Sequence, residues 1–235
     1  MMNLLTLSEQ EEFESNVHQI QKRASQIWAL RENGPLGPHF TNHLELANYG
    51  SGKAVVKTSK KLSEILFKLE TINLIFHGLP AEFMDNESRL KYEKHILEYL
   101  NEQGLNVPEL VYSDAKGAVT TLYLAHTPIV ENLRGQDQEQ TIARLTEGLM
   151  GIHDFGMHGG ASVYNAFIHN GKRYWSDFER FQKTGAVSLL LHDLHHFIQS
   201  VSKHSHIPLR KAEEIVLDAY KKLPVRRAYM PIGFG

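Results

Sequence analysis

The sequence contains no cysteine, which excludes disulfide bonds, a thiol nucleophile and a cysteine-ligated zinc site. An excess of charge of one sign is also missing, because 25 Lys and Arg residues face 27 Asp and Glu residues and the formal net charge is -2. No global electrostatic field therefore points to a nucleic-acid or membrane partner.

Long apolar runs are absent as well. No window approaches the roughly 20 uncharged apolar residues that a membrane span needs. The first residues include a short apolar run, but they lack the basic segment and the small-residue cleavage site of a secretory signal. We therefore expect a protein without a membrane span, located in the cytoplasm.

The first half of the chain combines helices with hairpins. Ser8 and Glu11 predict a capping box at the start of a helix over residues 8–30. A glycine turn between two strand-like runs predicts a hairpin over residues 44–57. A helix is expected over residues 60–76. Leu62, Ile65, Leu66 and Leu69 lie on one face of it.

A second helix over residues 86–103 and a second hairpin over 110–124 complete this half, which is an α+β pattern. From residue 137 onward the chain is mainly helical. The exception is a hairpin around Asn170-Gly171, which is the strongest short-range hairpin signal. The helices of this half are expected to begin with a stripe of Ile142, Leu145, Leu149 and Ile152, and to continue near 186–202 and 210–222.

Lys57 and Glu93 form a candidate ion pair. Lys57 ends a strand-like run of β-branched residues, and Glu93 lies among leucines on the expected inner face of the helix over 86–103. A buried carboxylate is costly unless it is paired, and Lys57 is its natural partner. The pair is either a structural ion pair with no further role or part of a functional site.

Asn165 and Asp177 flank the Asn-Gly hairpin, so both are expected at the same end of it. A carboxylate and an amide oxygen at one point suit a hard cation such as Mg²⁺, which keeps its other positions for water and substrate phosphates. The alternative is that both residues only cap the hairpin.

Loop 158–165, with the sequence HGGASVYN, resembles the H-x-D-x-x-x-x-N catalytic loop of protein kinases. Asp177 follows Asn165 by 12 residues and matches the kinase DFG aspartate in position. Lys57 looks like the third-strand lysine, and Glu93 like its partner on the αC helix. The chain thus resembles the protein-kinase-like superfamily, and within it the small atypical members: RIO kinases, the KEOPS-complex kinase, and lipopolysaccharide and Kdo kinases.

The resemblance implies a bilobal α+β fold. Residues 1–37 would form an N-terminal helical extension, 38–127 an N-lobe that contains a β-sheet, and 128–235 a mainly helical C-lobe. ATP would lie between the lobes near a hinge at 123–127.

The resemblance also implies a role for each matched residue. Lys57 would contact the ATP phosphates, with Glu93 orienting it, and Asn165 and Asp177 would bind Mg²⁺. His158 would be the structural histidine of the loop.

One position departs from the family pattern. The third residue of the loop should be an aspartate that takes up the proton of the acceptor hydroxyl, and here it is Gly160. Asp154, His158 or Glu179 are candidates to replace it. The glycine-rich loop of typical kinases is also incomplete, although atypical kinases often lack it.

These observations support two functions. The first is a pseudokinase that binds ATP and Mg²⁺ and acts through a protein partner. The alternative is a divergent but active phosphotransferase that moves the ATP γ-phosphate to a hydroxyl of a protein or of a small molecule such as a sugar or lipopolysaccharide. A third possibility is a different transfer, such as adenylylation.

Two further patterns have simpler interpretations. Asp154-Phe155-Gly156 spells DFG, but it precedes the loop and is interpreted as the C-terminal turn of a helix. Asp193 resembles the αF aspartate that anchors the kinase catalytic loop. A group of histidines beside it is interpreted as a polar helix face rather than a zinc site: His192, His195 and His196.

Overall fold

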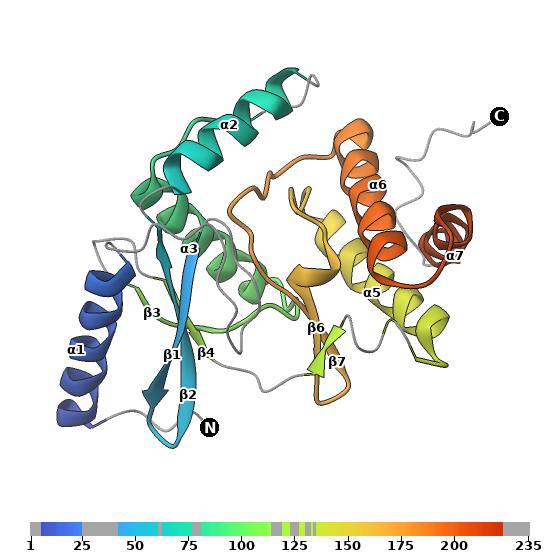
Figure 1. Cartoon of the computed structure of the whole chain (residues 1–235). Coiled ribbons are helices and arrows are strands. Elements are labelled where there is room, and N and C mark those ends of the chain that lie inside the picture. The colour runs from blue at the N-terminus through green and yellow to red at the C-terminus, as the bar shows by residue number, and fades with distance from the viewer. Residues whose placement is uncertain are drawn as a thin grey trace. The chain divides into compact units, whose positions relative to one another are not determined.

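The computed structural model describes residues 6–24, 42–60, 63–76, 81–113, 119–122, 127–129, 133 and 135–222. The chain divides into two compact units (Figure 1). Unit 1 comprises Met1–Glu98 and Pro108–Tyr123, and unit 2 comprises Tyr99–Val107 and Leu124–Gly235. The expected hinge at 123–127 lies almost entirely outside the described residues.

Unit 1 is built on a four-stranded antiparallel sheet with the strand order β1-β2-β4-β3. The predicted first hairpin is confirmed, and its strands pair in register from end to end around a turn at Gly50 and Ser51. The second hairpin is confirmed in its strands, while its turn lies outside the described residues. The strands are β1 (Asn42–Tyr49), β2 (Gly52–Ser59), β3 (Leu110–Ser113) and β4 (Val119–Leu122).

Helix α1 (Leu7–Ala24) packs against β1 and β2 (Figure 1). Phe13, Val17 and Ile20 are buried at this contact, as their helical spacing predicts. The ring of Phe13 meets the ring of Tyr49 edge-on at 5.1 Å and that of Tyr112 at 5.8 Å. The helix therefore closes one part of the core of unit 1.

The predicted capping box of α1 is wrong by two residues. Thr6 and Glu9 make the reciprocal bonds: the Thr6 amide donates to Glu9 Oε2 at 2.8 Å, and the Glu9 amide donates to Thr6 Oγ1 at 3.4 Å. Both pairs fit the S/T-x-x-E pattern, and the helix begins earlier than the Ser8 pair requires.

Helix α2 (Ser63–Phe76) lies within the predicted range, but the apolar face named from the sequence is not its buried face, and Leu62 lies outside the described residues. Ile65 is 57% exposed and Leu69 is 58% exposed. Phe67 and Thr71 are buried instead. The apolar side chains of α2 are distributed around its whole circumference, so their spacing in the sequence does not select one face.

Helix α3 (Asn86–Glu102) matches its predicted range, and the boundary between the units falls within it. Glu93 is buried together with Leu90 and Leu97, as expected. Arg89 is fully buried and donates to Asn42 Oδ1 at 3.0 Å, which ties the helix to β1.

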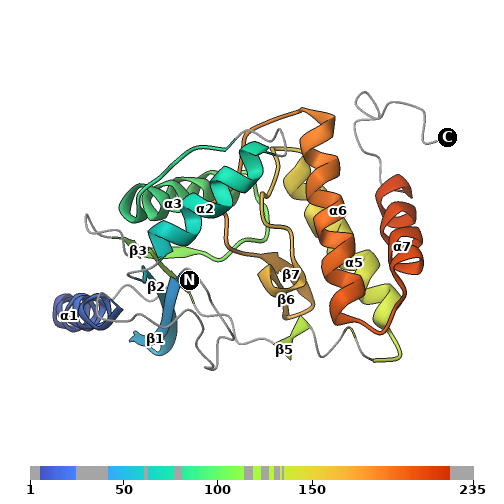
Figure 2. The same ribbon diagram turned by 45° about the horizontal axis from the view of Figure 1, so that its top comes forward.

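Among the residues that the structure describes, unit 2 combines the helices α5, α6 and α7 with a small sheet of order β5-β6-β7. Helix α7 packs against both α5 and α6 (Figure 2). The predicted stripe on α5 is confirmed, since its four apolar residues are at most 2% exposed. The elements are β5 (Thr127–Pro128), α5 (Gln138–His153), η1 (Val163–Asn165), β6 (Ala166–His169), β7 (Lys172–Trp175), α6 (Val187–His204) and α7 (Leu209–Lys222).

The β6–β7 hairpin is confirmed around Asn170 and Gly171. These two residues have φ values of 49° and 72°, the left-handed backbone that a two-residue type I′ turn requires. The register places Ala166 opposite Trp175 at the base of the hairpin. Among the residues described, no helix combines the length and hydrophobicity needed to cross a membrane.

Phe13→Ala should destabilise unit 1 by about 3–5 kcal/mol, because it leaves a cavity where the ring meets two tyrosines. Leu7→Ala is the matched control on the same helix. Leu7 is 76% exposed, so we expect a change below about 0.5 kcal/mol. Urea denaturation measures both values. Equal effects of the two substitutions would contradict the packing of α1 on the sheet.

Candidate functional site

The predicted ion pair of unit 1 is present. The Lys57 ammonium on β2 donates to Glu93 Oε1 at 3.0 Å, and its distance to Glu93 Oε2 is 2.8 Å. The Glu93 side chain is 3% exposed and that of Lys57 is 13% exposed. Both carboxylate oxygens of Glu93 thus face the Lys57 ammonium. The two residues lie on a strand and a helix that are distant in the sequence.

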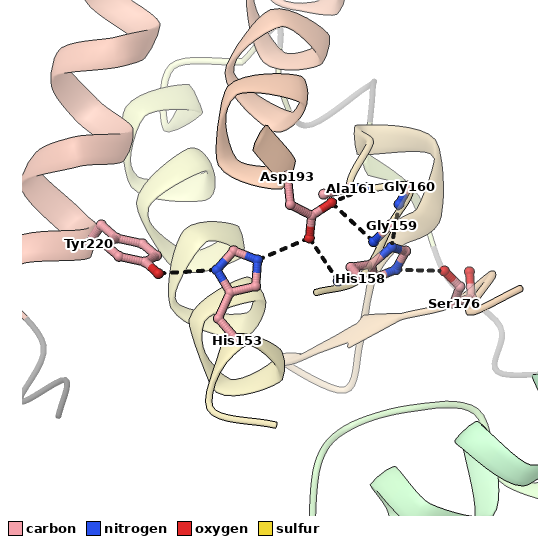
Figure 3. Close-up of polar contacts among 8 residues, drawn as sticks. All are labelled: His153, His158, Gly159, Gly160, Ala161, Ser176, Asp193 and Tyr220. Atoms are coloured by element: carbon pink, nitrogen blue, oxygen red, sulfur yellow. Dashed lines mark hydrogen bonds and ion pairs between the residues drawn. The ribbon is translucent and has the colours of Figure 1, made fainter. Parts of the chain in front are cut away.

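In unit 2, the carboxylate of Asp193 on α6 holds the backbone of loop 158–165 (Figure 3). Its Oδ2 accepts from the amide of His158 at 2.8 Å. Its Oδ1 accepts from the amides of Gly159 at 3.2 Å and Ala161 at 3.3 Å. Asp193 is 1% exposed, so this loop backbone is fixed to a buried charge.

Asp193 is ionised despite its burial. Burial alone raises the pKa of a carboxyl group, but the hydrogen bonds from the His153 side chain and the His158 amide outweigh it, so the pKa lies below its usual value. His153 on α5 contributes through its Nε2, which is 3.0 Å from Asp193 Oδ2.

Helix α6 holds the loop at a second point. Ser200 lies seven residues after Asp193, which places both side chains on the same helix face. Its Oγ accepts from the Val163 amide at 3.1 Å and is 3.0 Å from Ser162 Oγ. One helix face therefore holds the loop from residue 158 to residue 163.

His158 connects the loop to the strand end that precedes Asp177. Its Nε2 donates to the Ser176 carbonyl at 3.1 Å, and its Nδ1 accepts from the Gly160 amide at 3.2 Å. Burial lowers the pKa of His158, although the charges of Asp193 and Asp177 oppose this shift. A neutral imidazole with its proton on Nε2 satisfies both bonds, which is the geometry of a structural histidine.

Gly160 and Asn165 lie together in the loop. The Asn165 Nδ2 donates to the Gly160 carbonyl at 2.9 Å, so its Oδ1 is the group left for a cation. A Cβ atom placed on Gly160 would meet Asn165 Nδ2 at 3.7 Å and His158 Nδ1 at 3.9 Å, which are ordinary contacts. The backbone therefore has room for a side chain at position 160.

Gly159 differs from its neighbour. It has a φ of 81°, and a Cβ atom there would collide with the carbonyl oxygen of Arg180. Only glycine fits this position without a shift of the backbone.

Asn165 and Asp177 both lie at the base of the β6–β7 hairpin. The amide of Ser176 donates to the Asn165 carbonyl at 2.8 Å, which brings the residue before Asp177 next to Asn165. Asp177 itself has a φ of 68°, an unusual backbone for a non-glycine residue and one that is concentrated at functional sites.

Glu179 adds a second acidic side chain, with a carboxylate oxygen within 4.8 Å of one of Asp177. Sequence reasoning considered it only as a replacement for the base. Three oxygen-bearing side chains are thus available in this part of unit 2 to bind a hard cation: Asn165, Asp177 and Glu179.

The two simpler interpretations agree with the structure. Helix α5 ends at His153, and the Gly156 amide donates to the Ile152 carbonyl at 3.0 Å, so the DFG-like segment is a helix end. His192, His195 and His196 are exposed on α6, as a polar face should be.

Sequence reasoning missed His153 and Tyr220. Both are buried, and the Tyr220 hydroxyl lies 3.1 Å from His153 Nδ1 (Figure 3). The one available signal for His153 was a histidine next to Ile152 of the buried stripe. Tyr220 is 67 residues further along the chain and had no signal of its own.

No family model and no curated protein sequence matches the chain. Solved structures do match it. WaaP in complex with acyl carrier protein is 13% identical, with 97% of this chain and 91% of WaaP covered at a TM-score of 0.50. The Rio2 kinase–ADP/Mg²⁺–phosphoaspartate complex from Chaetomium thermophilum is 12% identical, with 92% and 68% covered at 0.52.

The chain has a protein-kinase-like fold. The expected α+β class, with a sheet-containing N-terminal part and a mainly helical C-terminal part, is confirmed. At this level of identity the likeness establishes the fold alone. The likeness assigns no role to individual residues of the site.

The two adjacent glycines of the kinase-like loop should respond differently to substitution. Gly159→Ala should destabilise unit 2 by more than about 1–3 kcal/mol, because its left-handed backbone and the Arg180 carbonyl both oppose a Cβ atom. Gly160→Ala should change the free energy of unfolding by less than about 1 kcal/mol. Chemical denaturation measures both. A larger loss at Gly160 than at Gly159 would contradict the loop geometry.

Proposed function

We propose that this chain is a kinase-like protein that binds ATP and Mg²⁺ but lacks the usual catalytic aspartate, and that it acts through a protein partner as a pseudokinase. The observation that supports this most directly is the loop at Gly160. Its backbone is held by Asp193 and Ser200, yet the residue at the base position has no side chain.

Lys57 is the proposed contact for the nucleotide phosphates. A largely buried lysine that faces two carboxylate oxygens is held in one orientation by its partner Glu93. In protein kinases, a lysine and glutamate on these two elements must be in place before the phosphates are bound productively.

Asn165 and Asp177 are the proposed ligands of Mg²⁺. The free amide oxygen of Asn165 and the carboxylate of Asp177 are hard donors, and such a site uses few protein ligands. When bound, the ion would neutralise charge on the phosphates. Glu179 is positioned to add a further carboxylate beside Asp177.

A protein partner is proposed because a chain without turnover has to act by binding. The WaaP structure was solved with acyl carrier protein, so one protein of this fold binds a protein partner. For this chain we propose a partner only at the level of a protein.

The second candidate function is an active phosphotransferase. It is favoured by the retention of Lys57, Glu93, Asn165 and Asp177 in ordered geometry. The acceptor oxygen would bond to the γ-phosphorus, the bond from that phosphorus to the bridging oxygen would break, and the acceptor proton would leave to solvent. Loss of the base would then slow the reaction by about 10²- to 10⁴-fold without abolishing it.

Nucleotide binding should depend on Lys57 and Asp177. We expect Lys57→Met and Asp177→Asn each to weaken the Kd of Mg-ATP at least about tenfold, which corresponds to about 1.4 kcal/mol. Asparagine tolerates the left-handed backbone at position 177, so this change removes charge with little strain. Isothermal titration calorimetry with and without EDTA measures both effects.

Lys53→Met is the matched control, because Lys53 lies on the same strand and is exposed. Its Kd should equal that of the wild type. No heat of binding for wild-type protein at millimolar Mg-ATP would remove both candidate functions and leave a scaffold protein.

Restoring the aspartate should distinguish the two functions. Position 160 has room for a side chain, so Gly160→Asp should fold and raise release of labelled phosphate or autophosphorylation by about 10²- to 10⁴-fold over a near-zero wild-type rate. Gly160→Asn controls for side-chain size. Wild-type transfer that is lost in Asp177→Asn would instead refute the pseudokinase and establish the phosphotransferase.

A further inference from the structure

Tyr220 lies on α7, a helix that supplies none of the proposed nucleotide or metal residues. Its ring is 7% exposed, and its hydroxyl is 3.1 Å from Nδ1 of His153, which lies on α5. The two rings meet at 65° with their centroids 6.0 Å apart. A tyrosine hydroxyl inside a protein interior needs such a partner, since an unpaired buried hydroxyl is costly.

The contact of His153 Nε2 determines which atom donates in the hydrogen bond between His153 Nδ1 and Tyr220. Its Nε2 lies 3.0 Å from Asp193 Oδ2, and an ionised carboxylate only accepts hydrogen bonds. The proton of a neutral His153 must therefore be on Nε2. Its Nδ1 then carries a lone pair, so the Tyr220 hydroxyl must be the donor in the hydrogen bond between these two atoms.

The protonation states agree with this order of donors. Burial, with smaller effects from the charges of Asp154 and Asp193, raises the pKa of Tyr220 to about 12, so the hydroxyl keeps its proton at neutral pH. The contacts with His153 and His158 lower the pKa of Asp193 and keep it an acceptor.

We propose that Tyr220 is a positioning residue for the kinase-like loop, acting through His153 and Asp193 (Figure 3). Its hydroxyl donates to His153 Nδ1 and so holds the ring in the orientation from which Nε2 donates to Asp193. Asp193 in turn accepts from the amides of His158, Gly159 and Ala161. The hydroxyl on α7 thus fixes the backbone around the position at which the catalytic aspartate is missing.

The orientation of the ring explains why the hydroxyl matters. If the ring turned so that Nε2 no longer faced Asp193, the carboxylate would lose one of its donors in a buried site. Without the Tyr220 hydroxyl, the ring would lose one of the two hydrogen bonds that hold this orientation. The orientation of Asp193, and with it the three loop amides, would be less strictly set.

Tyr220→Phe tests the proposal because it keeps the ring and its packing. In ¹⁵N-labelled, nucleotide-free protein, long-range ¹H–¹⁵N spectra should show the Nε2-H tautomer of His153 in the wild type and a mixed or shifted signal in the variant. Hydrogen exchange of the His158, Gly159 and Ala161 amides should accelerate about tenfold. Tyr174→Phe, which removes a hydroxyl from β7, is the control and should leave these signals unchanged.

A second variant separates positioning from packing. His153→Gln offers Asp193 an amide donor that has no tautomers. In that background, Tyr220→Phe should have no further effect on the loop amides, which is the signature of a coupled pair in a double-mutant cycle. Equal acceleration of exchange in both backgrounds, or unchanged exchange of the loop amides in Tyr220→Phe, would overturn the proposal.

The significance of the loop for nucleotide binding rests on the proposed function. The series of hydrogen bonds from Tyr220 through His153 to Asp193 does not rest on it. A further titration of Tyr220→Phe with Mg-ATP should give a Kd several-fold weaker than that of the wild type. If wild-type protein binds no Mg-ATP while the tautomer and exchange results hold, the proposed function fails and Tyr220 remains the positioning residue of this loop. If the protein binds Mg-ATP and Tyr220→Phe changes neither the His153 imidazole signal nor the exchange of the loop amides, the positioning role of Tyr220 alone fails.

Discussion

The carboxylate of Asp193 accepts hydrogen bonds from three loop amides and one imidazole N–H in an almost fully buried site. The ordered backbone of the loop in unit 2 depends on these bonds. A buried charge is tolerated only when its hydrogen-bonding capacity is used, and here both oxygens are used. The loop needs this support, because Gly159 and Gly160 have no side chains that could hold it from within. Two of its other residues are held by Ser200 on the same helix face.

Local patterns in the sequence predicted the parts of the fold that local physics determines. Asn170-Gly171 predicts its hairpin because both residues accept the left-handed backbone, and Glu93 is predicted to be buried because its helical neighbours are leucines. The buried face of α2 was not predictable, since apolar residues surround that helix. The relay from Tyr220 to His153 and Asp193 joins residues 67 and 40 positions apart, and no short-range pattern records such contacts.

The adjacent glycines of the loop have separate explanations, which bears on what the missing aspartate means. Gly159 is required by its backbone and by the nearby Arg180 carbonyl, so it belongs to the architecture of the loop. Gly160 has neither constraint. Because the fold would accept a side chain at position 160, the absence of an aspartate there is a difference in chemistry and not a consequence of the backbone.

Fold stability alone also does not explain the Lys57–Glu93 pair. Removing two charges from water costs free energy that their attraction rarely exceeds, and a buried ion pair can often be replaced by apolar residues without loss of stability. Stability alone therefore does not account for a cation that is largely buried on a central strand and held by both oxygens of a 3% exposed carboxylate. Under the proposed function a nucleotide phosphate would account for it, because it would add a negatively charged partner to a lysine that is already oriented. This role for Lys57 is the same whether or not the loop transfers the phosphate onward.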